Sequence, residues 1–231
     1  MKIAIIGNSH IAALKLAWTE IAPDFPQHQI VFFGHRGNKI ANLIEKEERL
    51  VGKDPGLRKA MKFTSGGVGA INPKDYDLFL VHGVGLDALF LPEGRFFTSK
   101  FIAGAAHEIG TRAPAMKIIN LIRSLSKKPV YVGHMPLPVA SEVRGDQSTA
   151  AFVNGMAFLE EKMFAPLDAK LVLQPLETIV NGESTERRFK QNSTSLAIGD
   201  SWDNHNHRDT DRRHMNAEFG KLWLNQFFGR I

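Results

Sequence analysis

The chain has 231 residues, of which 43% are hydrophobic and 23% are charged, and its formal net charge is +5. This length and composition predict a globular protein with a substantial core, which we expect to form one domain over residues 1–231. The absence of cysteine excludes disulfide bonds, thiolate metal sites and a cysteine nucleophile. No stretch approaches the roughly 20 apolar residues of a membrane span. The apolar run at residues 2–7 ends too early for a secretory signal, so we expect a cytoplasmic protein with no membrane partner.

The excess positive charge is local. It lies in three clusters, which are Lys127 with Lys128, Arg187 and Arg188 with Lys190, and Arg208 with Arg212 and Arg213. Such clusters either face solvent or attract an anionic substrate or partner. Because no zinc finger, basic zipper or aromatic RNA-binding pattern accompanies them, we expect no nucleic-acid partner.

The first elements alternate between strand and helix. Residues 2–7 (KIAIIG) are apolar on both faces, which is typical of a buried strand in a parallel sheet. Apolar residues then recur at helical spacing over 10–21, and residues 29–34 (QIVFFG) predict a second strand. Residues 41–52 predict an amphipathic helix, and 53–59 (KDPGLRK) predict a turn.

The same alternation continues to the end of the chain. A third buried strand is predicted at 77–83, followed by helical periodicity over 98–126 that is broken near Pro114. A fourth strand at 128–133, a helix over 146–167 and a fifth strand at 169–173 come next.

A polar segment, 177–213, precedes a final helix predicted over 214–229. Strands that alternate with helices predict an α/β fold of three layers, in which helices cover both faces of a five-stranded parallel sheet. Ligands bind such sheets at the carboxyl ends of the strands, so the loops that follow the strands form the candidate site.

Ser9 lies where the first strand ends and the first helix begins. Its hydroxyl can face the crevice while its N–H joins the unpaired donors of the helix, although serine there is also a common helix cap. Asp211 precedes His214 by three residues, so one tight loop can bring a carboxylate to one ring nitrogen and leave the other for a serine proton. Together they predict Ser9 as nucleophile, His214 as base and Asp211 as the residue that orients the base.

These blocks resemble those of the SGNH (GDSL-like) hydrolases. The strand that runs into Gly7-Asn8-Ser9 is similar to the family's first block, and Asp211-x-x-His214 before the last helix is similar to its last block. Gly37, after the second strand, matches the glycine whose N–H binds the oxyanion in that family. The resemblance spans nearly the whole chain and implies a flavodoxin-like fold and a Ser-His-Asp triad that needs neither cofactor nor metal.

One block departs from that family's pattern. The third block reads Gly-x-Asn-Asp in the family, and its Asn side chain is the third oxyanion donor, whereas Gly85 stands at this position here. Loss of such a donor typically lowers turnover by about 10²- to 10³-fold. Asn38, His82 or the N–H of Gly85 are candidates for the missing donor; otherwise catalysis is weak or lost. Asn8, in place of the family's Asp, is a milder change.

The resemblance implies a carboxylic ester hydrolase, with an acyl ester such as an O-acetyl saccharide as substrate, or an acyltransferase. A catalytically silent binding module for a saccharide or a protein is the alternative that Gly85 favours, whereas the intact triad argues against it. The side chains that we expect beside the substrate are Asn8, His10, Asn38, His82 and His134. His10 and His82 also suit purely structural roles.

Two other kinds of site are open alternatives. The segment WDNHNHRDTDRRH contains metal-ligand side chains, although their spacing matches no known helical zinc motif; they are Asp203, His205, His207, Asp209, Asp211 and His214. A first strand that ends in glycine also suits nucleotide binding, but neither G-x-G-x-x-G nor a P-loop follows it. We therefore predict a hydrolase without a metal.

Overall fold

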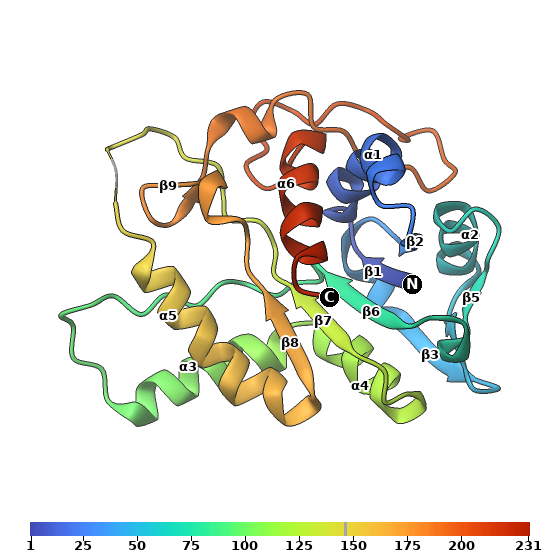
Figure 1. Cartoon of the computed structure of the whole chain (residues 1–231), viewed down its shortest axis with the longest axis horizontal. Coiled ribbons are helices and arrows are strands. Elements are labelled where there is room, and N and C mark those ends of the chain that lie inside the picture. Colours follow the sequence, from blue (N-terminus) through green and yellow to red (C-terminus); the bar gives the residue numbers. More distant parts are fainter. Residues whose placement is uncertain (146) are drawn as a thin grey trace.

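The centre of the fold is a five-stranded, all-parallel sheet with the strand order β2-β1-β6-β7-β8 (Figure 1). The computed structural model describes residues 1–145 and 147–231. The strands of this sheet are β1 (Lys2–Gly7), β2 (Gln29–Gly34), β6 (Leu78–His82), β7 (Val130–Gly133) and β8 (Ala169–Val172). They confirm the predicted five-stranded parallel sheet.

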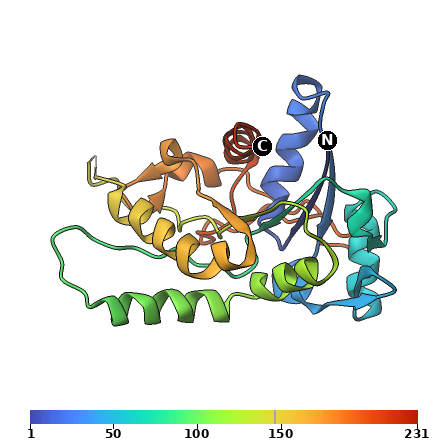
Figure 2. The same ribbon diagram turned by 60° about the horizontal axis from the view of Figure 1, so that its bottom comes forward.

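Helices cover both faces of this sheet. They are α1 (Ile11–Ile21), α2 (Pro55–Thr64), α3 (Ser99–Arg112), α4 (Ala115–Leu125), α5 (Ala150–Leu159) and α6 (Ala217–Phe228). In Figure 2, α1 (blue) and α6 (red) lie on one side of the sheet, and α3, α4 (green) and α5 (yellow) lie on the other. Among the helices of the described residues, none is long and apolar enough to cross a bilayer.

The side chains of β1 alternate between the two layers of core. Ile3 and Ile5 pack into the cluster formed with α1 and α6, whereas Ala4 and Ile6 pack into the cluster that includes α4 and α5. All four side chains are fully buried. Because successive residues of a strand point to opposite faces, a strand with both faces covered must be apolar on both, as the sequence IAIIG at residues 3–7 is.

The helix predicted over 41–52 is wrong. These residues form the hairpin of β3 (Leu43–Lys46) and β4 (Arg49–Gly52), and β4 pairs in turn with β5 (Ala70–Ile71). Glu47 and Glu48 make the two-residue turn with φ of 53° and 56°. Such turns usually carry Asn or Gly, so two glutamates gave no turn signal in the sequence.

The turn predicted at 53–59 is also wrong, because α2 begins within it. Asp54 caps this helix: its Oδ1 accepts a hydrogen bond from the N–H of Leu57 at 3.0 Å. Pro55 occupies the first helical position, where its missing N–H costs nothing. The DPG sequence therefore starts a helix here.

The remaining predicted elements lie close to their observed positions. The helical region 98–126 breaks before Pro114, between α3 and α4. Of the helix predicted over 146–167, residue 146 lies outside the described residues; α5 covers the middle, and a π-helical turn and a 3-10 turn follow it. The segment 177–213 is irregular apart from the hairpin of β9 (Ile179–Val180) and β10 (Ser184–Thr185) and short 3-10 turns.

Gly220 allows α6 to pack closely against α1. A β-carbon at this position would lie 2.2 Å from the carbonyl oxygen of Ala13 and 2.9 Å from Cβ of Ala17. We therefore expect Gly220→Ala to lower the free energy of unfolding by about 1–3 kcal/mol, measured by urea denaturation. Gly104→Ala, in α3, is the matched control, because a β-carbon there meets nothing within 4 Å. It should be neutral or slightly stabilising, and equal losses in both variants would contradict this account.

Candidate active site

The turn from β1 into α1 places Ser9 at the carboxyl edge of the sheet. Gly7 is required at this turn, because a β-carbon there would lie 2.1 Å from Cγ2 of Ile11 and 2.7 Å from the carbonyl oxygen of His82. The hydroxyl of Ser9 does not cap α1, whose N-terminus has no side-chain cap. Instead, Asn8 stabilises the turn by accepting a hydrogen bond from the N–H of His10 at 3.1 Å.

Ser9, His214 and Asp211 form a continuous hydrogen-bonded chain. The Oγ of Ser9 lies 2.8 Å from Nε2 of His214, and Nδ1 of His214 lies 2.7 Å from Oδ2 of Asp211. His214 lies in the loop before α6 and not in the helix, which begins at Ala217. Because α1 and α6 pack side by side (Figure 1), residues 205 positions apart come together at their ends.

The carboxylate of Asp211 is held in place by the backbone of its own loop. Its Oδ1 accepts hydrogen bonds from the N–H groups of Arg213 at 2.8 Å and His214 at 3.0 Å. Burial raises the pKa of Asp211, but these two N–H groups and the His214 ring together lower it to about 2. The carboxylate is therefore ionised at neutral pH and accepts the proton on Nδ1 of His214, which leaves Nε2 free to accept one from Ser9.

Two further imidazole rings pack against that of His214. The His207 ring lies 3.9 Å from it, centroid to centroid, at an angle of 13°, and the His10 ring lies 4.9 Å away at 24°. Burial, and next the charge of His214, lower the pKa of both His10 and His207. Because both rings are uncharged, they can hold the His214 ring in position by stacking without repelling a positive charge on it.

His207 also belongs to a cluster of metal-ligand type. Atoms of His207, Asp211 and His214 lie within 4.8 Å of one another. An ion binds an imidazole in the plane of the ring, and two nearly parallel, stacked rings offer no position that lies in both planes. Both ring nitrogens of His214 already have partners in Ser9 and Asp211. The geometry therefore favours a proton relay over a metal site.

The backbone N–H groups of Ser9 and Gly37 are the predicted oxyanion donors. Within the described residues, no acceptor takes the N–H of Ser9 or that of Gly37, which opens a 3-10 turn, η2 (Gly37–Asn42). Gly37 has φ of 65°, and the space beside its Cα is open. The N–H of Gly85, in contrast, donates to the carbonyl of Gly83 at 2.9 Å, so in this conformation it is already used.

His82 and His134 are placed as buried, neutral side chains. His82 is 1% exposed and packs edge-on against Trp223, and burial lowers its pKa to about 3. His134 is 2% exposed; its Nδ1 donates to the carbonyl of Met135, and its Nε2 accepts from the N–H of Gln174. Burial lowers the pKa of His134 to about 4. Neither ring reaches the surface beside Ser9 in this conformation.

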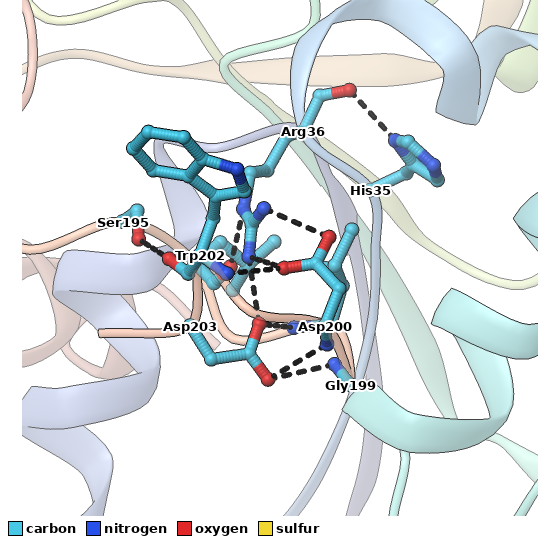
Figure 3. Close-up of polar contacts among 9 residues, drawn as sticks. His35, Arg36, Ser195, Gly199, Asp200, Trp202 and Asp203 are labelled. Carbon is cyan, nitrogen blue, oxygen red and sulfur yellow. Dashed lines mark hydrogen bonds and ion pairs between the residues drawn. The ribbon is translucent and has the colours of Figure 1, made fainter. Parts of the chain in front are cut away.

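Arg36, just before Gly37, joins the loop after β2 to the segment 195–203 (Figure 3). Its guanidinium donates to both carboxylate oxygens of Asp200, at 2.9 and 3.0 Å, and to Oδ1 of Asp203 at 2.6 Å. Asp203 in turn accepts from the N–H groups of Ile198 and Gly199, both at 2.8 Å. This clamp joins the backbone just before Gly37 to the segment that leads to His207, and sequence patterns gave no sign of it.

We expect Arg36→Gln to lower kcat by about tenfold or more for any ester turned over at this site, with KM little changed. The reason is that a misplacement of about 1 Å in a catalytic group typically costs up to about 10²-fold in rate, and Arg36 is bonded directly to Gly37. Steady-state kinetics with a short-chain nitrophenyl ester provides the measurement. Arg49→Gln, on the exposed face of β4, is the control and should leave kcat unchanged. An unchanged kcat in Arg36→Gln would show that the clamp has no effect on the site.

Comparison with known proteins gives only distant structural likenesses. No known family model matches the chain, and no curated protein matches it in sequence. It is similar to the solved structure of a gut microbial diltiazem-metabolizing enzyme, with a TM-score of 0.46 and 12% identity, over 99% of this chain and 46% of that one. It is also similar to a DUF4886 family protein from Bacteroides uniformis, with a TM-score of 0.38 and 13% identity, over 99% of this chain and 81% of that one. The chain thus spans less than half the length of the first of these proteins.

Proposed function

We propose that this chain is a serine esterase or acylhydrolase of the SGNH type. The observation that carries the proposal is the relay of Ser9, His214 and Asp211, in which both hydrogen bonds are shorter than 3 Å. The substrate class that we propose is an acyl ester, such as an O-acetyl group on a saccharide.

In the proposed reaction, Oγ of Ser9 attacks the ester carbonyl while Nε2 of His214 takes the hydroxyl proton. His214 then returns this proton to the leaving alcohol, and an acyl group remains on Ser9. Water, activated by the same imidazole, attacks the acyl-enzyme and releases the acid. If another hydroxyl replaces water, the product is a new ester and the chain acts as an acyltransferase.

The negative charge that develops on the carbonyl oxygen needs hydrogen-bond donors. The N–H groups of Ser9 and Gly37 are the two that we assign, because both lack an internal acceptor among the described residues. A side chain at Gly85 is not tolerated, since a β-carbon there would lie 2.5 Å from Cδ of Pro114. The amide of Asn38 lies beside this blocked position, with its Oδ1 3.7 Å from where that β-carbon would be. We therefore propose the Asn38 amide as the third donor.

We expect Asn38→Ala to lower kcat by about 10²-fold with little effect on KM, because an oxyanion donor acts mainly in the transition state. The comparison is Asn42→Ala in the same 3-10 turn, which should behave as the parent protein. Equal kcat values in the two variants would remove Asn38 from the oxyanion site.

Labelling with a fluorophosphonate tests the proposed function directly, since it modifies only an activated serine. We expect the parent protein to be labelled on Ser9 and to hydrolyse a short-chain nitrophenyl ester, and Ser9→Ala and His214→Ala to do neither. Asn8→Ala is not a suitable control, because Asn8 supports the turn. Ser124→Ala, at an exposed position of α4, leaves the triad and the Arg36 clamp intact and should be labelled normally. A parent protein that is neither labelled nor active would favour the silent binding module.

A further inference from the structure

A polar cavity of about 540 Å³ adjoins the Asp211 end of the relay. It lies between the loop after β7 and the segment 187–212, and its walls include His207 and Asp211. Figure 1 shows this segment in orange, passing above α6. The cavity therefore touches the residues that hold His214, and it is large enough for a small organic ligand.

Lys190 is an unusual lining residue, because its side chain is only 12% exposed. Within residues 1–145 and 147–231, the carboxylate that pairs with its ammonium is that of Asp209, 3.5 Å away and itself fully exposed. A pair of this length with one partner in solvent stabilises little. Burial of a lysine ammonium is costly unless a partner compensates it, so Lys190 has a deficit of negative charge around it.

Arg212 adds a second cation whose position is fixed. Its Nε and Nη2 both donate to the carbonyl oxygen of Val139, at 2.9 and 2.6 Å. In the part of the chain that the structure describes, Nη1 of Arg212 has no acceptor. Arg187 is a third cation on the same cavity and is exposed. The cavity thus offers guanidinium and ammonium donors that are already held in place.

The acidic groups of the cavity do not balance these cations. Asp211 is already bonded to two backbone N–H groups and to the His214 ring, and its low pKa shows that these partners stabilise its charge. The other acidic residue of the cavity is Asp209, whose side chain is fully exposed. We propose that this cavity binds a small oxyanion group, a carboxylate, phosphate or sulfate, through the ammonium of Lys190 and the guanidinium of Arg212.

The oxyanion group has two possible sources, which share the same chemistry. It belongs either to an acidic ester substrate or to a separate ion that binds next to the relay. Binding itself does not depend on the proposed esterase function, so the first experiment measures binding alone.

The probe is inorganic phosphate, titrated at constant ionic strength and followed by calorimetry and by the thermal midpoint. We expect saturable binding to the parent protein and to Lys59→Gln, a control at an exposed lysine of α2. Lys190→Gln should weaken the phosphate Kd by about tenfold or more, since it removes a charge-assisted hydrogen bond. If Lys190→Gln does not fold, Arg187→Gln should still weaken binding severalfold. Absence of saturable binding to the parent protein, or equal Kd values in the lysine variants, would overturn the proposal.

Kinetics then distinguishes the two sources. Phosphate that raises KM for an acidic ester but not for a neutral ester places the oxyanion group on the substrate. Phosphate that changes the hydrolysis of both esters to the same extent indicates a separate ion. Both outcomes require phosphate to bind in the cavity. A parent protein that binds phosphate but hydrolyses neither ester would reject the esterase function without rejecting the anion site.

Discussion

Ser9→Ala and His214→Ala are each expected to lower kcat for a short-chain ester by about 10⁴- to 10⁶-fold, and the double variant should be no worse than either. The two residues share one proton transfer across a distance of 2.8 Å, so the loss of either removes the same step. Non-additivity of this kind is the signature of residues that act as a unit. The measurement is kcat of the three variants under single-turnover and steady-state conditions.

The control for this experiment is the thermal stability of each variant, which shows whether the variant is folded. Ser9 is half-buried and its hydroxyl takes no part in capping α1, so Ser9→Ala should keep the parent's thermal midpoint within a few degrees. His214→Ala removes a ring that packs against His10 and His207 and should cost somewhat more stability. A Ser9→Ala protein that retains more than about a tenth of the parent's kcat would exclude Ser9 as the nucleophile.

The inner strands of the sheet were predictable because they are buried on both faces. A run such as VYVG, at residues 130–133, is buried throughout because the layers on both sides of the sheet cover it, and its position between helical patterns indicates parallel pairing. The hairpin over 43–52 was not predictable in this way. It lies beside the sheet, its two strands are only four residues long, and glutamates form its turn.

The candidate site was partly predictable for a similar reason. The Asp211-x-x-His214 spacing brings carboxylate and imidazole together within one loop, and this local contact is visible in the sequence. The Arg36 clamp spans more than 160 positions and follows from tertiary packing alone, so nothing near Arg36 indicates it. His207 was visible only as one of several histidines in a polar segment; its stacking on His214 depends on how that segment folds back.

Asp211→Asn is expected to lower kcat at neutral pH by about 10⁴-fold while the loop keeps its shape. The reason lies in how the two carboxylate oxygens are used. Oδ1 accepts the N–H groups of residues 213 and 214, so in the variant the amide oxygen takes this position and the NH₂ group faces His214. The NH₂ donates to Nδ1 of His214, which moves the ring proton to Nε2. His214 then cannot accept the proton of Ser9.

The same variant has a stability signature that depends on pH. The native pKa of Asp211, about 2, is below the value of about 3.9 for an unfolded chain, so its charge stabilises the fold above about pH 4. This contribution, about 2 kcal/mol, is lost as the pH falls from about 4 through 2. The stabilisation of the parent relative to Asp211→Asn should therefore shrink as the pH falls below about 4.

Urea denaturation at several pH values measures this difference, with Asp24→Asn at an exposed position as the control. The control should show no such change with pH. If Asp211→Asn lowers the free energy of unfolding by the same amount at every pH, the carboxylate is a structural group of the loop and its charge does not stabilise the fold. A kcat loss of about 10⁴-fold at neutral pH, where the variant is still folded, indicates that Asp211 acts through the tautomer of His214. A stability difference that is present at neutral pH and disappears in acid accounts for the charge of the carboxylate and not for the loss of turnover.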